Sequence, residues 1–399
     1  MKVTGITAEF DPLHNGHAYL MEEARRLTGC DALAVAMSGD FVQRGEPALT
    51  DKWARTEAAL RSGADLVVEI PVLFCLGDAS RYASASVRLL EECGCSHIAF
   101  GSESGDVKAL QALADFINGH REELGDGIRT LTGKGLSWPA ARAVVLRELG
   151  GHEIPESPND ILALEYVMNM SLASPLAVKR EGSGYSDELF SDVKYPSATA
   201  VRRYLSDRRG DNNTSVDKLS EWMPAASADA LKKAPLSFTD EWITLLRYAV
   251  MSKEAADIEE CPSGGEGLGN LLKKAADCED SFEGIISSVK SKRYTYTRIS
   301  RLCMQAMLGI TREGYPYDAP GYIRVLGFTE RGRELLSWIK DSDSCSLPVI
   351  SNINKEAGYF DDAASKMLAL DVHAADIYNL VTGRDSAKYS DHVRRPVMI

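Results

Sequence analysis

Apolar residues follow two patterns through the first half of the chain. Five short, evenly apolar runs predict buried strands, because each is too short for a helix. These runs are residues 3–8, 32–37, 66–70, 98–100 and 176–179. Between them, apolar residues recur at helical spacing near residues 17–28, 52–62, 80–93, 106–118, 139–150 and 158–170. Strands and helices that alternate in this way predict an α/β fold with a Rossmann-like, doubly wound parallel sheet.

The pattern changes in the second half. Residues 206–218 are polar, which predicts a linker or a long loop. Beyond this break the strand signal fades, and we predict helices near residues 219–233, 239–254, 266–277, 281–291 and 295–309. Residues 347–399 show a mixed pattern that predicts no element. We therefore expect a catalytic domain over residues 1–207 and a mainly α-helical region over residues 216–399.

The clearest chemical signal follows the first strand. His14-Asn15-Gly16-His17 opens the first helix, so both imidazoles lie in its first turn. A helix N-terminus attracts phosphate through free backbone N–H groups, and Gly16 lets a phosphate chain approach the backbone. The two imidazoles then donate hydrogen bonds to the α- and β-phosphates as pyrophosphate leaves. We predict that His14 and His17 are catalytic. The alternative, two surface histidines in a loop, is less favoured because the motif stands between a strand and a helix.

A second helix start carries phosphate-binding chemistry. Ser197 or Thr199 is placed to cap a helix after the fifth strand, and Arg202 lies in its first turns. By itself this pattern is more typical of an ordinary capped helix. Together with the histidines it predicts a nucleotide site at the carboxyl ends of the strands, where Gly101 also lies.

Composition narrows the class of protein. The chain has 399 residues and a net charge of −13, which argues against non-specific coating of nucleic acid. Its eight cysteines are scattered without zinc-site spacing, which favours reduced thiols in a cytoplasmic protein. No apolar stretch approaches the ~20 residues of a membrane span, and charged residues interrupt the first apolar run, unlike a signal peptide.

Several further motifs carry a resemblance that spans the chain to about residue 330. They are Glu9–His17, Met37–Gly39, Gln43–Ala48, Lys52–Thr56, Phe100–Glu103, Gly105-Asp106, Pro158-Asn159, Ile161-Leu162, Ser197–Thr199 with Arg202, Pro224–Ala228, Lys292–Thr295, Thr297-Arg298, Tyr322–Arg324 and Leu326-Gly327. With these residues the chain resembles the bacterial tRNA(Met) cytidine acetate ligases, a family of HxGH nucleotidyltransferases. Two positions depart from the family's usual pattern, Asp11 in place of Asn and Asp40 after Ser38-Gly39.

The resemblance implies a reaction and a site. ATP and acetate form acetyl-adenylate and pyrophosphate, and the acetyl group passes to N4 of the wobble cytidine of elongator tRNA(Met). Mg²⁺ is expected with ATP, although the sequence shows no dedicated metal cage. The implied ATP site comprises Thr7, Ala8, Glu9, Phe10, Asp11, Pro12, Leu13, His14, Asn15, Gly16, His17, Ala18, Tyr19 and Leu20, with Gly101, Asn159 and Arg180.

One segment of the second half has the composition of an RNA-binding surface. Residues 284–312 hold six basic residues and no acid, with tyrosines interleaved. Apolar residues in this segment recur at helical spacing, so Arg298 and Arg301 are expected off the buried stripe and free for phosphate. Tyrosines of this segment can stack on splayed bases. The predicted tRNA-binding residues are Lys290, Lys292, Arg293, Tyr294, Arg298 and Arg301.

Three questions stay open at this level. Arg44, Lys52 and Arg55 follow the strand ends and can serve phosphate, acetate or RNA, although at least one of Arg55 and Arg61 is expected on the surface. Asp40 and Glu46 are among the candidates for a base at the cytidine amine. The alternatives to an acetate-activating ligase are a metabolite adenylyltransferase, which leaves the second half unexplained, and a non-catalytic ATP- or RNA-binding protein.

Overall fold

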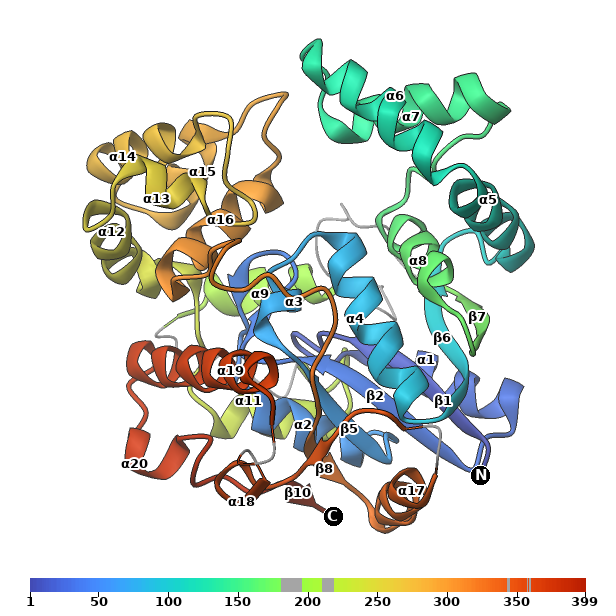
Figure 1. The fold of residues 1–399 in the computed structure, drawn as a ribbon. Coiled ribbons are helices and arrows are strands. Elements are labelled where there is room, and N and C mark those ends of the chain that lie inside the picture. The colour runs from blue at the N-terminus through green and yellow to red at the C-terminus, as the bar shows by residue number, and fades with distance from the viewer. Residues whose placement is uncertain (181–195, 210–218, 343–344, 357, 359) are drawn as a thin grey trace.

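The structure, a computed structural model, describes residues 1–180, 196–209, 219–342, 345–356, 358 and 360–399. Most of the predicted linker at 206–218 lies outside these residues. Strands and helices alternate through the first half as the sequence predicts (Figure 1). The strands are β1 (Val3–Ala8), β2 (Ala32–Ser38), β3 (Phe41–Val42), β4 (Glu46–Pro47), β5 (Leu66–Ile70), β6 (Cys95–Ser102) and β7 (Ser174–Lys179). The helices are α1 (Asn15–Thr28), α2 (Lys52–Arg61), α3 (Val72–Cys75), α4 (Ala79–Glu92), α5 (Val107–Gly119), α6 (Arg121–Gly133), α7 (Trp138–Gly150), α8 (Pro158–Asn169) and α9 (Ala198–Ser206).

The five predicted strands form the centre of one parallel sheet. They stand in the order β5-β2-β1-β6-β7, and each pairs in parallel with its neighbours. The order turns back on itself at β1, between β2 and β6, which places the switch point of the sheet beside the start of α1. Ligands of open α/β sheets bind at such a point, outside the carboxyl ends of the strands. The predicted doubly wound fold is confirmed.

The second half returns to this sheet, which the sequence did not reveal. After several helices, β8 (Ile323–Phe328) pairs antiparallel with β5, and β9 (Val349–Ile350) and β10 (Val397–Met398) pair with β8. The sheet therefore has eight strands. The helices of this half are α11 (Ala225–Lys233), α12 (Ile243–Met251), α13 (Ala255–Glu259), α14 (Leu268–Cys278), α15 (Phe282–Val289), α16 (Tyr296–Leu308), α17 (Glu330–Asp341), α18 (Ile353–Glu356), α19 (Asp362–Val381) and α20 (Ser386–Tyr389), with a 3₁₀ turn at Thr239–Trp242.

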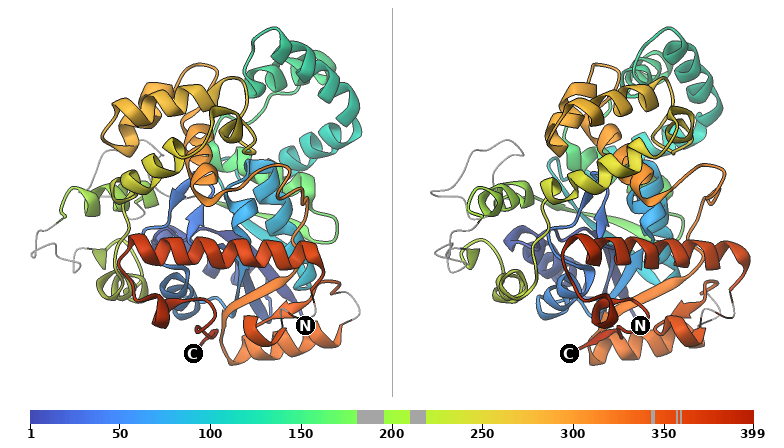
Figure 2. Two further views of the ribbon diagram at one scale, coloured as in Figure 1. Left: turned by 60° about the vertical axis from the view of Figure 1, so that its left-hand side comes forward. Right: turned by 90° about the vertical axis from the view of Figure 1, so that its left-hand side faces the viewer.

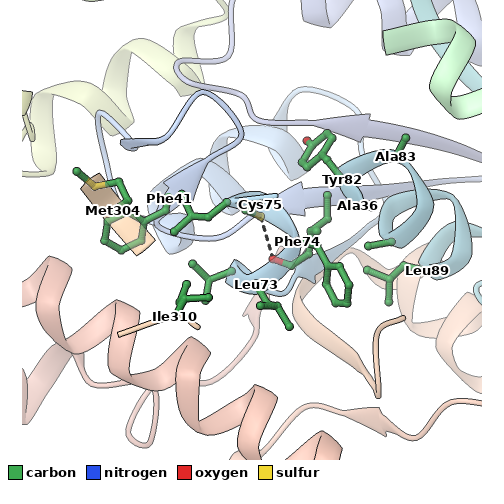
Figure 3. Close-up of a cluster of buried hydrophobic side chains, with 14 of the residues drawn as sticks. Ala36, Phe41, Leu73, Phe74, Cys75, Tyr82, Ala83, Leu89, Met304 and Ile310 are labelled. Carbon is green, nitrogen blue, oxygen red and sulfur yellow. Dashed lines mark hydrogen bonds between the residues drawn. The ribbon is translucent and has the colours of Figure 1, made fainter. Parts of the chain in front are cut away.

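Both faces of the sheet are covered, which explains the even apolarity of its strands. Along β2, Ala34 and Ala36 belong to the core on the α4 face, whereas Val35 and Met37 belong to the core on the α1 and α2 face. The α4-face core continues into the second half, where Met304 and Ile310 lie near Phe41 (Figure 3). The two halves of the chain thus share one hydrophobic core.

Two helical lobes rise from the body at the edge where the parallel strands end. One lobe is built from α5–α8 and the other from α12–α16. The helix α3 directly follows β5 and so marks the carboxyl edge of the sheet, and both lobes lie beyond it (Figures 1 and 2). Among the described residues, no helix is long and apolar enough to cross a membrane. All eight cysteines are free, as their spacing predicts.

Candidate functional site

The turn between β1 and α1 uses its own backbone to orient both histidines. His14 is the N-cap of α1, and its Nδ1 accepts the N–H of Gly16 at 3.1 Å. Nδ1 of His17 accepts the N–H of His14 at 3.2 Å. A neutral imidazole carries one proton, and because Nδ1 of each ring accepts a hydrogen bond, the proton lies on Nε2. Each ring therefore presents one N–H donor away from the helix.

Burial keeps both rings neutral. His14 is 5% exposed, and its ring stacks on that of His17 with centroids 3.8 Å apart. Burial, followed by the charges of Arg180 and Arg202, lowers the pKa of His14 to about 3. Burial, followed by His14 and Arg180, lowers the pKa of His17 well below its usual value. The pair is thus a set of neutral hydrogen-bond donors.

The backbone amides of the first helical turn are already occupied, so the expectation that they are free for phosphate is wrong. The N–H of Asn15 donates to the carbonyl of Trp222 at 2.9 Å, and those of His17 and Ala18 donate to the carbonyl of His14. The glycine also has a different role from the predicted one. A Cβ at Gly16 would lie 2.9 Å from Cε1 of His14, so Gly16 makes room for the imidazole of His14. The donors that this turn leaves available are therefore the imidazole N–H groups.

The second helix start joins the same corner of the molecule. Ser197 caps α9 by accepting the N–H of Ala200 at 3.2 Å, as the sequence predicts. Arg202 reaches back to the first turn and donates to the carbonyl of Asp11 at 2.7 Å. Thr199 receives the guanidinium of Arg44 at 3.1 Å. The chain thus brings the two predicted phosphate-binding elements together.

Asp11, where the family pattern differs, has a structural task. Its carboxylate accepts the N–H of Leu49 at 2.6 Å and lies 3.4 Å from Arg202. Asp11 is 2% exposed, so it ties the loop at residue 49 and Arg202 to the histidine turn. These contacts give an acid at this position a structural role.

Glu9 and Glu46 line the same corner beside Arg44. Nearby, Glu9 accepts the N–H of Gln43 at 2.8 Å. Burial raises the pKa of both glutamates, although Arg44 and Arg202 oppose the shift. Burial also lowers the pKa of Arg44. From the sequence, Arg44 and Glu46 are only open candidates, because nothing local shows that the 41–47 hairpin folds over the end of β1.

Gly101 lies near the end of β6, and Asn159 lies beside it in the first turn of α8. A Cβ at Gly101 would lie 3.4 Å from Cγ of Arg180, so Gly101 lets that side chain pass closely. Asn159 donates to the carboxylate of Glu103. Asp160, which the sequence did not single out, accepts the N–H of Ser104 at 3.0 Å and the hydroxyl of Ser102. These contacts fix the turn after β6 against α8.

Asp160 is held in its charged form by this turn. Burial alone would raise the pKa of its carboxyl, but the hydrogen bonds from Ser102 and Ser104 outweigh burial and lower that pKa.

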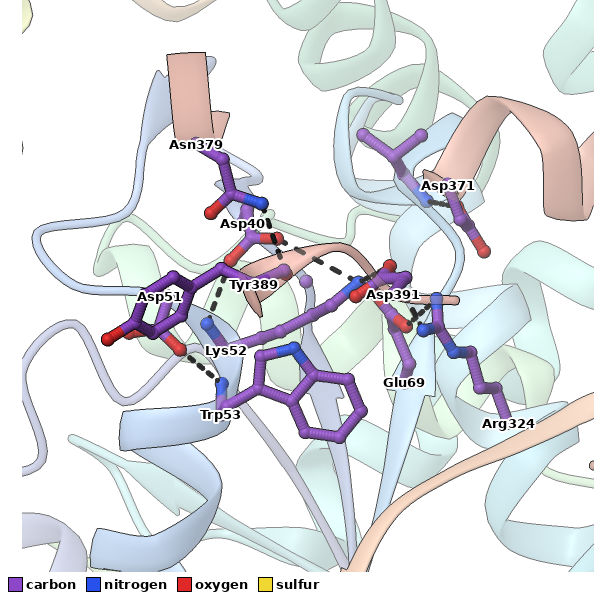
Figure 4. Close-up of polar contacts among 12 residues, drawn as sticks. Asp40, Asp51, Lys52, Trp53, Glu69, Arg324, Asp371, Asn379, Tyr389 and Asp391 are labelled. Atoms are coloured by element: carbon purple, nitrogen blue, oxygen red, sulfur yellow. Dashed lines mark hydrogen bonds and ion pairs between the residues drawn. The ribbon is translucent and has the colours of Figure 1, made fainter. Parts of the chain in front are cut away.

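Lys52 and Arg55 serve the fold. Lys52 is 1% exposed, and its Nζ lies 2.8 Å from Glu69 and 2.6 Å from Asp391 (Figure 4). Arg324 pairs with the same two carboxylates at 2.9 and 3.0 Å, so this network fastens β8 and the C-terminal segment to the end of β5.

Arg55 and Asp40 are also buried. The guanidinium of Arg55 donates to the carbonyls of Thr50, Glu9 and Ser38 at 2.9, 2.7 and 3.1 Å, and Arg61 is the exposed member of the pair. Asp40 accepts the N–H of Lys52 at 2.8 Å. Burial raises the pKa of Asp40 to about 6, against the opposing charge of Lys52.

The predicted RNA-binding segment divides into exposed and buried residues. Lys290, Lys292 and Arg293 are exposed at the turn between α15 and α16. Tyr294 is only 7% exposed, and its hydroxyl donates to the carbonyl of Glu266 at 2.7 Å. The expectation that its ring is open to a base is therefore not met.

The two arginines of α16 also differ. Arg298 is half-buried and bonds to Ser263 and Glu266 at 3.1 Å each. The expectation that Arg301 lies free for phosphate is wrong, because it is 9% exposed and its guanidinium donates to the carbonyl of Gln43. Burial lowers the pKa of Arg301 to about 10. A position off the apolar stripe of α16 is thus still buried, because the 41–47 hairpin covers it.

Comparison with known proteins agrees with this geometry. The family described as HIGH Nucleotidyl Transferase matches residues 1–392. A fold with its switch point at β1 and two neutral histidines at that point define a nucleotidyltransferase of this class.

Relatives over the full length define the particular family. The tRNA(Met) cytidine acetate ligase of Acetivibrio thermocellus is 35% identical over 95% of this chain and 94% of its own. That of Clostridium novyi is 33% identical over 100% of both chains. The chain also superposes on the crystal structure of Thermotoga maritima TmcAL bound with α-thio ATP, with a TM-score of 0.89 and 30% identity over 100% of this chain and 99% of the other. The chain belongs to the tRNA(Met) cytidine acetate ligase family, and it is an enzyme of the ligase class.

Proposed function

We propose that this protein activates acetate with ATP and transfers the acetyl group to N4 of the wobble cytidine of elongator tRNA(Met). The names of the full-length relatives and the ATP analogue bound to the Thermotoga maritima protein support this assignment. The observation that carries it is the pair of neutral imidazoles His14 and His17, whose Nδ1 atoms accept backbone N–H groups.

The first step needs no protein nucleophile. A carboxylate oxygen of acetate attacks the α-phosphorus of ATP, and the bond to the bridging oxygen breaks as pyrophosphate takes the electron pair. The Nε2–H groups of His14 and His17 donate hydrogen bonds to the oxygens that gain charge. Neutral rings suit this task, because they keep their donors without a proton to lose at neutral pH. Catalysis in this step is therefore positioning and electrostatic stabilisation.

Arginines supply the positive charge that the histidines lack. Burial is the main cause of the lowered pKa of His14, and the charges of Arg180 and Arg202 add to it because both guanidinium groups lie near that ring. Arg202 is held by Asp11 and lies beside Thr199. We assign Arg180 and Arg202 to the phosphates, with Ser197 and Thr199 shaping the helix start that presents them. We assign Gly101, near the end of β6, and Asn159, at the start of α8, to the border of the same site.

Among the residues that the structure describes, no group of histidine, cysteine and acidic side chains could by itself hold the Mg²⁺ ion expected with ATP. Of the carboxylates nearest the histidines, Glu9 accepts the N–H of Gln43 and Asp11 accepts that of Leu49, while Oδ2 of Asp11 faces Arg202 at 3.4 Å. The ion is then held by phosphate oxygens and water, as Mg²⁺ with a nucleotide commonly is.

In the second step, N4 of the cytidine attacks the acyl carbon, the bond to the adenylate oxygen breaks, and AMP leaves. The amine proton passes to a basic group or to water. Lys290, Lys292 and Arg293 are the exposed cations of the predicted RNA segment and are assigned to the tRNA backbone. We also propose that the protein acts in the cytoplasm, together with its tRNA.

Mass spectrometry of the tRNA tests the proposal. Unmodified elongator tRNA(Met) is incubated with ATP and isotopically labelled acetate, digested, and analysed for acetylated cytidine in the anticodon. We expect the label at the wobble cytidine with wild-type protein and with His373→Ala, a histidine on α19 far from the turn in sequence, but not with His17→Ala. Turnover of ATP with a small metabolite that ignores acetate and tRNA would instead indicate a metabolite adenylyltransferase.

A further inference from the structure

Two acid-free stretches stand out in this acidic chain, and the predicted RNA segment accounts for only one. One is residues 284–312, and the other is residues 127–147, which hold four basic residues. With 58 acids in 399 residues, a run of this length without one is expected by chance. The role of the second stretch therefore depends on its place in the fold and on the side chains that it exposes.

The second stretch forms the tip of the other helical lobe. It covers the end of α6, the turn at residues 134–137 and most of α7. The lobe that contains α6 and α7 and the lobe that contains α16 both rise at the carboxyl edge of the sheet (Figures 1 and 2). The two acid-free stretches thus lie on the two lobes that flank the candidate site.

A tryptophan stands exposed at the start of α7. Ala141, Arg142 and Val145 are buried, and Trp138 continues the same helical face by one turn. Unlike them, Trp138 is 54% exposed. The guanidinium of Arg142 lies over its ring at 5.3 Å and is itself fixed by Glu165 at 2.6 Å. The guanidinium of Arg142 thus covers one face of the indole of Trp138, and the other face can take a stacking partner.

The charges at this tip favour a polyanion. Arg129 and Arg147 are exposed and pair with Asp126 and Glu153. Lys134, in the turn itself, is exposed and forms no ion pair with any residue that the structure describes. An exposed aromatic ring beside an unpaired cation is the combination that binds unpaired nucleotides, by stacking and by phosphate contact.

We infer that the α6–α7 turn is a second RNA-contacting surface, in which Trp138 stacks on a base of the tRNA and Lys134 contacts its backbone. This inference rests on the proposed function, since it takes RNA as the substrate. The tRNA then lies between the two lobes, held by Lys292 and its neighbours on one side and by Trp138 on the other. A protein partner is the less favoured occupant, because the acid-free turn selects negative charge.

The test separates RNA binding from adenylate chemistry. Wild type, Trp138→Ala, Trp138→Phe and Lys134→Glu are compared for tRNA affinity by filter binding at several salt concentrations. Their acetate-dependent exchange of labelled pyrophosphate into ATP is measured without tRNA. Leu172→Ala and Lys340→Glu are the matched controls. Leu172 is 76% exposed before β7, and Lys340 is exposed on α17 along the opposite edge of the sheet (Figure 1).

We expect Trp138→Ala to weaken tRNA binding about tenfold, within the range for loss of one stacked base, and Trp138→Phe to restore most of it. Lys134→Glu should weaken binding several-fold and make the salt dependence shallower by roughly one contact. Pyrophosphate exchange should stay at the wild-type level in all variants, and both controls should bind tRNA normally.

Other results overturn the inference. If Trp138→Ala and Lys134→Glu bind tRNA like wild type, this turn does not contact RNA. A change in oligomeric state of Trp138→Ala by light scattering, with normal tRNA affinity, would make the turn a protein interface. If the wild-type protein itself binds no tRNA, the proposed function is wrong as well. This outcome is distinct from the two above, in which wild type binds tRNA.

Discussion

The histidine turn and the basic segment 284–312 were both predicted from short stretches of sequence, and the structure treats them differently. In the turn, His14 and His17 accept hydrogen bonds from N–H groups within three residues. In the segment, Tyr294 bonds to Glu266 and Arg301 to Gln43, which lie far away in the chain. Side chains oriented by their own turn keep the position that local sequence predicts. Charged side chains on a helix lose the exposure that it predicts when another part of the fold covers them.

The largest effect should follow from breaking the histidine turn. His17→Ala removes one Nε2–H donor from the leaving pyrophosphate and lowers the rate of acetyl-adenylate formation by about 10²- to 10³-fold. Rapid-quench measurement of the single-turnover rate checks this. His373→Ala, on α19, should retain the wild-type rate, and a tenfold or smaller loss for His17→Ala would deny it the catalytic role.

The contact between the hairpin and α16 can be broken at one glycine. Gly45 has φ +82°, and a Cβ there would lie 2.3 Å from the backbone nitrogen of Arg301. Gly45→Ala therefore combines a strained backbone with overpacking against a helix, and should lower the free energy of unfolding by about 3 kcal/mol in urea titration.

Gly125→Ala is the matched control. Gly125 lies inside α6, and no atom lies within 4 Å of the place that an alanine methyl group would take, so alanine should raise the free energy of unfolding by about 0.5–1 kcal/mol. Equal stability of Gly45→Ala and wild type would mean that the hairpin does not pack on α16.

A smaller effect, on tRNA affinity and its salt dependence, should distinguish the exposed from the buried cations of segment 284–312. Lys292→Ala removes one exposed charge, so tRNA affinity should fall a few-fold and the salt slope should become less negative by about 0.7–0.9. Arg301→Met should change thermal stability and leave the salt slope unchanged, because Arg301 is buried. Filter binding across a salt series measures both, and equal slopes for Lys292→Ala and wild type would contradict the assignment.

The smallest change concerns pH. Because the folded pKa of His14 is about 3 instead of 6.5, the unfolded chain takes up this proton first as the pH falls. The stability from neutral His14 is therefore complete above pH 6.5 and is lost progressively as the pH falls toward 3. ¹⁵N NMR of the folded protein should show His14 protonated only at Nε2 from about pH 8 to about pH 5.5. A titration of this ring near its usual pKa would show that it is not buried as described.

Features of the fold and the site could be predicted from sequence where they depend on local interactions, and were missed where they depend on residues far apart in the chain. The five parallel strands follow from runs of apolar residues, and Ser197 as the cap of α9 follows from its side chain. β8 was missed because Arg324 interrupts its apolar pattern, and only the distant Glu69 and Asp391 make an arginine tolerable there. Asp160 was missed because its partners, Ser102 and Ser104, meet it through the fold.

We propose that two neutral histidines, fixed by their own turn, stabilise pyrophosphate as it leaves ATP under attack by acetate. Exchange of labelled pyrophosphate into ATP, measured without tRNA, tests it most directly. We predict exchange that requires acetate, that proceeds with wild-type protein and that is lost in His17→Ala. Exchange that ignores acetate, or that continues unchanged in His17→Ala, would contradict the claim.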